Sequence, residues 1–267
     1  MISAYDVLDK HQPDGRYLYR HPDEPCLAYQ LAGADPQVMA EASKKLQDLG
    51  ADIIDINCGC PKQKIRKKGY GSALLEQHQL LLSIVRAMRQ AISIPLTVKI
   101  RINQLSTDCD LAKMLESEGI DALIVHGRNW QDGYDIPCNL QHIAQIKESI
   151  SIPLIVNGDV CDTRSAEHAL TITKADALMI GRAATGRPWL YRNLLEQRDD
   201  IPDMATRAAL FIEHIELLAV LESPFKAVLQ SRSLFRYYFR EWRDHANAYY
   251  QCVDLDDIKR FLAEKSL

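Results

Sequence analysis

The chain has 267 residues, of which 47% are hydrophobic and 25% are charged, and its formal net charge at pH 7 is −4. These proportions are those of an ordinary globular protein and exclude disordered, collagen-like and fibrous chains. A negative net charge also argues against a uniformly basic nucleic-acid binder, so that any contact with nucleic acid would use a local basic surface.

Two features of the sequence bear on the compartment. The longest apolar runs, such as 177–180, fall far below the ~20 residues of a membrane span, and the first ten residues lack a signal-peptide pattern. Seven cysteines, an odd number, fit free thiols in a reducing environment. We therefore predict a cytoplasmic protein without membrane contact.

Six short apolar runs are predicted as strands buried in a parallel sheet, and residues 2–7 give at most a seventh. Apolar residues at helical spacing lie between the runs. The predicted strands are 27–31, 52–57, 96–101, 121–126, 153–157 and 176–181, and the predicted helices are 37–49, 80–91, 107–118, 139–150 and 163–173.

Polar residues follow the C-terminal ends of successive predicted strands. In a (β/α)8 TIM barrel these ends meet at one mouth, whereas a doubly wound sheet gathers only those beside its switch point. We therefore predict an α/β TIM barrel. The strand count indicates that one βα unit is absent from the N-terminal part, which would leave an open barrel edge through which an otherwise monomeric protein could associate.

After Pro188 only helical patterns remain, at 204–221, 224–250 and 255–267. We predict a barrel domain over residues 1–195 and a small all-helical domain over residues 200–267.

The segment 57–61, Asn-Cys-Gly-Cys-Pro, is the densest chemical signal. Cys60 precedes a proline just past a strand end, so it is predicted to lie in an extended loop at the barrel mouth, as an acid or nucleophile. Cys58 is expected to be a packing residue. Because no His/Cys cluster with zinc spacing accompanies the pair, no metal is expected.

Basic residues crowd the loop that leaves Cys60, at Lys62, Lys64, Arg66, Lys67 and Lys68. Such a run is often a solvated face, but beside a catalytic mouth it suggests a polyanionic substrate.

The segments 157–159, Asn-Gly-Asp, and 181–182, Gly-Arg, follow the last two predicted strands, where barrels commonly bind phosphate. Tight turns are the alternative role for these glycines. Lys99 and His126 would add hydrogen-bond donors to the same cavity.

In the helical part, Arg232, Arg236, Arg240 and Arg243 are spaced by four, four and three residues, which predicts one helix face. This local excess of positive charge suits a nucleic-acid backbone. The aromatic residues beside it are expected to be core contacts.

Together these motifs resemble the bacterial branch of the tRNA-dihydrouridine synthase family. The resemblance extends from about residue 25 to residue 189 and more loosely beyond. It rests on the segments 55–61 (DINCGCP), 71–75 (GSALL), 98–101 (VKIR), 126–128 (HGR), 157–159 (NGD) and 181–189 (GRAATGRPW).

The resemblance implies that NADPH reduces bound FMN, that the flavin passes hydride to C6 of a flipped-out uridine in tRNA, and that Cys60 protonates C5. Asn57, Lys99 and His126 would assist catalysis. The residues implied around the flavin and its phosphate are Gln30, Lys99, His126, Asn157, Gly158, Asp159, Gly181 and Arg182, and those implied to bind RNA are Lys62, Arg66, Lys67, Arg101, Arg232, Arg236 and Arg240.

The family usually opens with a strand that carries Ala-Pro-Met-x-Gly and packs on the flavin. No such segment stands here, so weak FMN retention is expected. Two other classes stay open: a flavin-free barrel enzyme acting on a phosphorylated metabolite, and a noncatalytic RNA-binding relative.

Overall fold

The computed structural model describes residues 1–9, 17–103 and 105–266 and divides into two compact units. The first unit is Met1–Val160 with Ser165–Met179, and the second is Cys161–Arg164 with Ile180–Leu267. The domain limits suggested by the sequence, 1–195 and 200–267, stay a prediction. The terminal residue of the last predicted helix, Leu267, lies outside the described residues.

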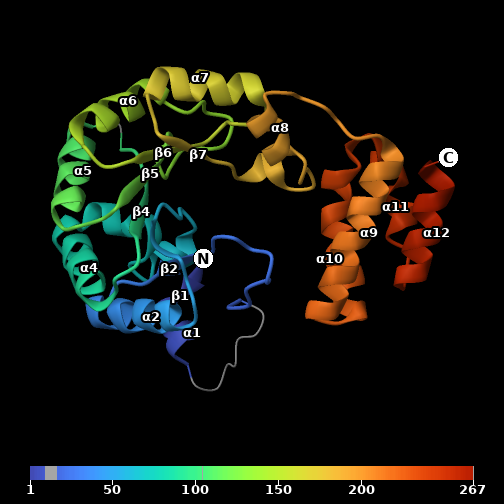
Figure 1. The fold of residues 1–267 in the computed structure, drawn as a ribbon, viewed down its shortest axis with the longest axis horizontal. Coiled ribbons are helices and arrows are strands. Elements are labelled where there is room, and N and C mark those ends of the chain that lie inside the picture. Colours follow the sequence, from blue (N-terminus) through green and yellow to red (C-terminus); the bar gives the residue numbers. More distant parts are fainter. Residues whose placement is uncertain (10–16, 104, 267) are drawn as a thin grey trace. The chain divides into compact units, whose positions relative to one another are not determined.

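The first unit is a curved parallel sheet with helices along its outer side (Figure 1). Each strand pairs with the next one along the chain, in the order β1 to β7. The strands are β1 (Ile2–Ser3), β2 (Ala28–Ala32), β3 (Ile53–Cys58), β4 (Leu96–Arg101), β5 (Ala122–His126), β6 (Leu154–Asn157) and β7 (Ala177–Met179). The helices are α1 (Ala4–Leu8), α2 (Pro36–Asp48), α3 (Gln63–Arg66), the 3-10 helix η1 (Gly71–Glu76), α4 (His78–Ala91), α5 (Thr107–Ser117), α6 (Leu140–Ser149) and α7 (Thr163–Thr173).

This strand order confirms the predicted α/β barrel architecture. A doubly wound sheet would reverse its order at a switch point, whereas here all six pairings join consecutive parallel strands. In the described residues β1 pairs only with β2 and β7 only with β6, so the sheet of seven strands has two edges. Residues 2–7, predicted as at most one strand, form the two-residue β1 and then α1.

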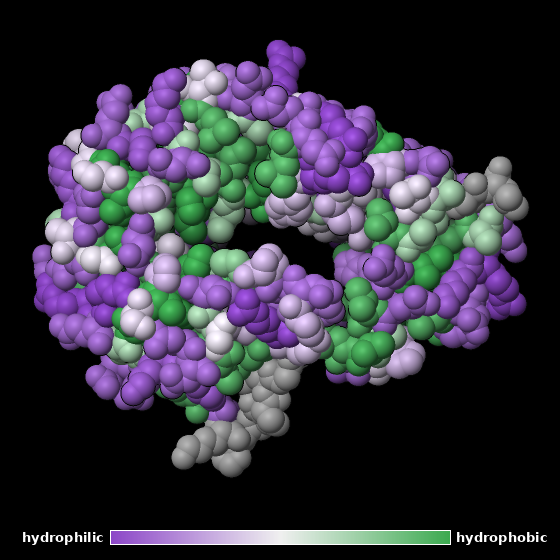
Figure 2. All heavy atoms as spheres, viewed as in Figure 1, coloured by the Kyte–Doolittle hydropathy of each residue, from purple (hydrophilic) through white to green (hydrophobic). Residues whose placement is uncertain are grey.

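The two faces of the sheet differ in chemistry because successive side chains of a strand point to opposite faces. On β3, Ile54, Ile56 and Cys58 alternate with Asp55 and Asn57, and all five are buried. The apolar face continues across the central strands and packs against the helices. In Figure 2 the outward surface of these helices is mainly hydrophilic. The polar face is therefore the inner face of the barrel.

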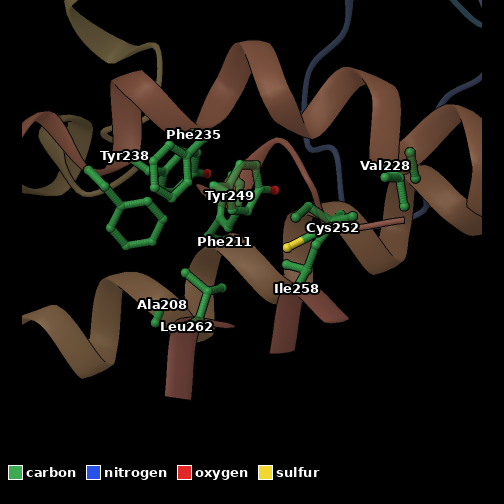
Figure 3. Close-up of a cluster of buried hydrophobic side chains, with 12 residues drawn as sticks. Ala208, Phe211, Val228, Phe235, Tyr238, Tyr249, Cys252, Ile258 and Leu262 are labelled. Carbon is green, nitrogen blue, oxygen red and sulfur yellow. The ribbon is translucent and has the colours of Figure 1, made fainter. Parts of the chain in front are cut away.

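The second unit is helical and has its own aromatic core. Phe235 stacks on Tyr249 with ring centroids 4.0 Å apart (Figure 3). Phe211 packs edge-on against Phe239 with ring centroids 5.2 Å apart. Its helices are the 3-10 helix η2 (Arg182–Ala184), α8 (Leu190–Glu196), α9 (Met204–Leu221), α10 (Pro224–Tyr238), the 3-10 helix η3 (Arg240–His245), α11 (Ala246–Tyr249) and α12 (Leu255–Ser266). None of the helices in the described ranges is long and apolar enough to span a membrane.

The prediction of a single helix over 224–250 is wrong about where that helix ends. It begins as expected, because Ser223 caps it and Pro224 occupies its first turn. It ends at Tyr238, since Phe239 adopts φ −123° and ψ 65°, outside the helical region. Phe239 is fully buried in the aromatic core, and its packing there accompanies the break.

Candidate active site at the C-terminal ends of the strands

Five of the predicted site residues lie on the inner face near the C-terminal ends of neighbouring strands. Asn57 of β3 stands opposite Lys99 of β4, and His126 of β5 stands opposite Asn157 of β6. Gln30 of β2 is opposite Asp55, two residues before Asn57. The parallel register thus brings together residues that are up to 127 positions apart, since 157 − 30 = 127.

Asp55 is a site residue that the sequence analysis missed. Its carboxylate accepts a hydrogen bond from Gln30 Nε2 and another from Thr97 Oγ1, both at 2.6 Å. Burial raises the pKa of Asp55 to about 6, although these hydrogen bonds and the charge of Lys99 oppose the shift. The alternation of β3 could have revealed it, because Asp55 shares the face of Asn57.

The loop that carries Cys60 is held on both sides. The backbone N–H of Cys60 donates to Asn57 Oδ1 at 3.0 Å, and its carbonyl accepts from the backbone N–H of Ser72 at 3.1 Å and from Ser72 Oγ at 3.0 Å. Gly71 has φ +62°, and a Cβ atom there would lie 2.7 Å from the Cys60 carbonyl oxygen. Only glycine permits this close approach behind Cys60.

Cys58 has a different environment from Cys60. It lies on the apolar face of β3 with no exposed surface, and burial raises the pKa of its thiol well above the usual value. The Cys60 side chain is partly exposed beyond the strand end. The two cysteines therefore differ in exposure and face, and their separate roles stay a prediction.

Lys99 and Asn157 meet across the inner face. Lys99 Nζ donates to Asn157 Oδ1 at 2.8 Å, and Asn157 Nδ2 donates to the carbonyl of Met179 on β7 at 2.8 Å. Burial lowers the pKa of Lys99 to about 8, against the opposing charge of Asp55. An ammonium has three N–H donors, and Asn157 takes one of them. Lys99 is therefore placed to donate to a ligand in the mouth.

His126 is neutral at physiological pH. Burial and then the positive charges of Arg101, Lys99 and Arg128 lower its pKa to about 3. Its Nε2 atom lies 3.5 Å from Arg128 Nη1, and because a guanidinium only donates, Nε2 is the accepting nitrogen. The N–H of the ring is then on Nδ1.

Asp159 and Arg128 form an ion pair at the ends of β5 and β6. Arg128 Nη2 lies 2.7 and 2.9 Å from the two carboxylate oxygens of Asp159, which also accepts from the Cys138 N–H at 2.9 Å. Burial acts to raise the pKa of Asp159, but these contacts outweigh it and lower the pKa. Asp159, predicted to contact the flavin, thus forms an ion pair within the protein, with an arginine for which no role was predicted. Gly158, directly before Asp159 in the chain, has φ +120°, and a Cβ atom there would lie 2.8 Å from His126 Cδ2.

The basic residues predicted to bind RNA fall into two groups in the first unit. Lys62 and Lys67 are exposed on and beside α3. Arg66 instead donates to Ser72 Oγ at 3.0 Å and to Glu76 at 2.7 Å. Arg101 is buried and donates to the carbonyls of Gly59 and Asn129, both at 2.9 Å. Arg66 and Arg101 therefore shape the loops, and their contact with RNA stays a prediction.

The arginines of the second unit do not share one helix face. Arg232 and Arg236 are on α10, whereas Arg240 begins η3 after the break at Phe239. Arg236 and Arg240 are exposed, and Arg232 is partly buried with Nη2 3.4 Å from the Cys252 carbonyl. Arg240 also borders a cavity of about 230 Å³, together with Arg187, Trp189, Arg207 and Tyr237. Glu241 also lines this cavity and forms an ion pair with Arg207, so Arg187 and Arg240 are the cations of the lining that this pair leaves over.

Gly181 and Arg182 belong to the second unit, whereas Asn157 and Asp159 belong to the first. A Cβ atom at Gly181 would meet nothing within 4 Å, so its backbone is open to a neighbouring group.

Comparisons with known proteins identify the family of this chain. The dihydrouridine synthase (Dus) family matches residues 1–264. The chain is 39% identical to tRNA-dihydrouridine synthase B of Pectobacterium carotovorum over 231 residues, which cover 83% of this chain and 72% of that protein. It is 35% identical to the enzyme of the same name from Pseudomonas aeruginosa over 268 residues, covering 94% and 80%. The solved structure of morphinone reductase has 20% identity and a TM-score of 0.49, covering 64% of this chain and 51% of that one.

Proposed function

We infer that this chain, which belongs to the dihydrouridine synthase family, is a flavin-dependent oxidoreductase that reduces uridines in tRNA. The residue assignment rests on one observation. The inner face of the sheet carries Gln30, Asn57, Lys99 and His126 on neighbouring strands, beside the loop that contains Cys60. We propose FMN as the flavin and NADPH as its reductant.

The donor set fits the polar edge of an isoalloxazine. Lys99 has N–H donors beyond the one that Asn157 accepts, and the neutral His126 has an N–H on Nδ1. Gly158 lacks room for a side chain against Cys138 and His126, so only glycine lets the His126 ring lie this close to the backbone. Gly181 and Arg182 would contact the phosphate. When bound, the flavin supplies hydride to C6 of the uridine.

Cys60 is the proposed proton donor. As hydride reaches C6, negative charge develops at C5, and a thiol held beside that carbon can transfer its proton there. Asn57 and Ser72 hold the Cys60 backbone, which fixes where the thiol lies. The deeply buried Cys58 faces the helices and takes no part.

The basic surfaces of both units would bind the phosphates of tRNA. In the first unit these are the exposed Lys62 and Lys67, together with Arg66 and Arg101. In the second unit they are the exposed Arg236 and Arg240, together with the partly buried Arg232. A cytoplasmic, monomeric protein stays our prediction.

The test is a set of three measurements on the purified full chain. Visible absorbance reports bound flavin, NADPH oxidation reports its reduction, and mass spectrometry of treated tRNA reports dihydrouridine. A colourless protein without activity would favour a flavin-free enzyme of phosphorylated metabolites. A protein that binds tRNA but leaves both NADPH and uridine unchanged would favour the noncatalytic relative.

A further inference from the structure

A continuous series of hydrogen bonds joins the interior of the sheet to the Cys60 loop. Thr97 Oγ1 donates to Asp55 Oδ1, Gln30 Nε2 donates to Asp55 Oδ2, and Asn57 Nδ2 donates to Gln30 Oε1, each at 2.6 Å. Asn57 Oδ1 then accepts from the backbone N–H groups of Cys60 at 3.0 Å and Gly59 at 3.3 Å. We call this series the Asp55 relay.

The two ends of the Asp55 relay determine its direction. A backbone N–H only donates, so Asn57 must turn its oxygen toward Cys60 and its NH2 toward Gln30. Gln30 must then present its oxygen to Asn57 and its NH2 to position 55. That position therefore requires an acceptor, and a carboxylate supplies one to each neighbour.

Burial of the Asp55 carboxyl group destabilises the fold unless its oxygens accept hydrogen bonds. The residue is 4% exposed in the interior of the sheet, where an apolar side chain would avoid the desolvation of a carboxyl group. Its neighbours on β3, Ile54 and Ile56, are apolar and face the helices. We therefore infer that the carboxyl group of Asp55 acts through the side chains that it binds.

We propose that Asp55 is a positioning residue that holds Cys60 through Gln30 and Asn57. The proposal rests on the proposed function, in which Cys60 donates the proton. Without an acceptor at position 55, the NH2 of Gln30 loses its partner and its amide can rotate. Asn57 then loses the acceptor of its own NH2, and the Cys60 loop loses its anchor. A small displacement of a reacting group is enough to slow a reaction strongly.

Three variants of the full chain separate the Asp55 relay from general packing. Asp55→Leu has nearly the same shape but no acceptor. Thr97→Val is the matched control, because it removes the hydrogen bond to Asp55 and leaves the path from Asp55 to Cys60 intact. Asp55→Asn should rescue function, because its oxygen can accept from Gln30 while its NH2 donates to the Thr97 hydroxyl.

The readouts are kcat and KM for tRNA per bound flavin, and the rate at which iodoacetamide alkylates Cys60. We expect Asp55→Leu to lower kcat by about tenfold or more with little change in KM, and to change the alkylation rate. Thr97→Val and Asp55→Asn should stay within about twofold of the parent chain in both readouts, since the path to Cys60 is kept.

The outcomes distinguish a failure of the proposed function from a failure of the Asp55 relay. A parent chain that binds flavin and tRNA but forms no dihydrouridine contradicts the proposed function. An active parent chain with unchanged kcat in Asp55→Leu, or with equal loss in Thr97→Val, overturns the Asp55 relay alone. Asp55→Ala is tested in parallel. If neither Asp55→Leu nor Asp55→Ala folds while Thr97→Val does, Asp55 has a purely structural role and the proposal fails.

Discussion

The Nη2 atom of Arg128 lies 2.7 and 2.9 Å from the two carboxylate oxygens of Asp159 and joins the ends of β5 and β6. The Arg128 side chain is 2% exposed, so Asp159, whose side chain is 41% exposed, supplies the countercharge of a buried guanidinium. Arg128 also donates to the carbonyls of Tyr134, at 3.1 Å, and Ile136. The ion pair therefore ties the loop after β5 to the mouth of the barrel.

Asp159→Ala should lower the free energy of unfolding by about 2–3 kcal/mol, because it leaves the buried guanidinium without a countercharge. Urea titration of the parent and variant chains measures this loss. Lys259→Ala is the control, since it removes an ion pair with Glu216 in which both side chains are exposed, at 44% and 48%, and should leave the unfolding free energy almost unchanged. Equal effects of the two substitutions would show that the buried ion pair of Arg128 contributes no more to the unfolding free energy than an exposed one.

Cys60→Ala should abolish uridine reduction and leave reduction of the flavin by NADPH intact, because the proton is needed only after hydride has left the flavin. Cys58→Ala should reduce activity mildly, since it removes only a packed sulfur on the apolar face. Dihydrouridine in tRNA and flavin bleaching under anaerobic conditions are the two measurements. Equal loss of dihydrouridine in both variants would refute the distinction between the cysteines.

The barrel order and most element limits could be predicted from the sequence because periodicity and strand-end residues report them directly. Helices α7 and α9 and strand β4 have the predicted bounds. The break at Phe239 escaped prediction because it accompanies the burial of Phe239 in an aromatic core built from distant segments. A local helical pattern carries no information about that core.

The inner-face residues Asn57, Lys99 and His126 could be predicted because each stands at a strand end. The alternation of β3 also places Asp55 on this face, but the roles of Asp55 and Arg128 depend on partners from other strands that the sequence does not reveal. Gln30 reaches Asp55 from another strand, and Asp159 reaches Arg128 from 31 positions away. Charge by itself also does not show that Arg101 is a buried donor to two carbonyls, and its contact with RNA stays a prediction.

His126 should make the fold sensitive to acid. Its pKa is about 3 in the folded chain against an ordinary value of 6.5, so between these values the unfolded chain binds a proton that the folded chain does not. The stability from the neutral ring is complete above about pH 6.5 and is lost as the pH falls toward 3. Urea midpoints over this range should fall less steeply in His126→Gln, whose side-chain oxygen can accept from Arg128 without titrating. Parallel slopes in parent and variant would contradict the assignment.

Arg236→Ala and Arg240→Ala should each weaken tRNA binding and reduce its salt dependence by about one counterion per lost phosphate contact. Both side chains are exposed. Arg232→Ala should act mainly on stability, because its guanidinium reaches the Cys252 carbonyl. Filter binding over a series of salt concentrations gives the slope. Arg260→Ala on α12 is the control outside this group, and an unchanged slope in the first two variants would assign them to an ordinary solvated surface.

The edges of the sheet should make the chain associate at high concentration. In the described residues β7 pairs only with β6, and its three residues are apolar, with Ala177 exposed and Leu178 and Met179 partly so. An edge strand offers unpaired backbone groups to another chain, and a charge on the edge is a common protection against this. We therefore expect Ala177→Lys to reduce association, measured by sedimentation velocity over a series of concentrations.

Ala209→Lys on α9 is the matched control, because it makes the same substitution at an exposed position outside the sheet. Each variant changes the net charge from −4 to −3, since one Lys adds +1. A smaller net charge weakens repulsion between chains and by itself favours association. A decrease in Ala177→Lys alone would therefore have to arise at the β7 edge. If both variants and the parent chain associate equally, the contact lies on another surface, and if the parent remains monomeric at every concentration, the edge is protected within the chain.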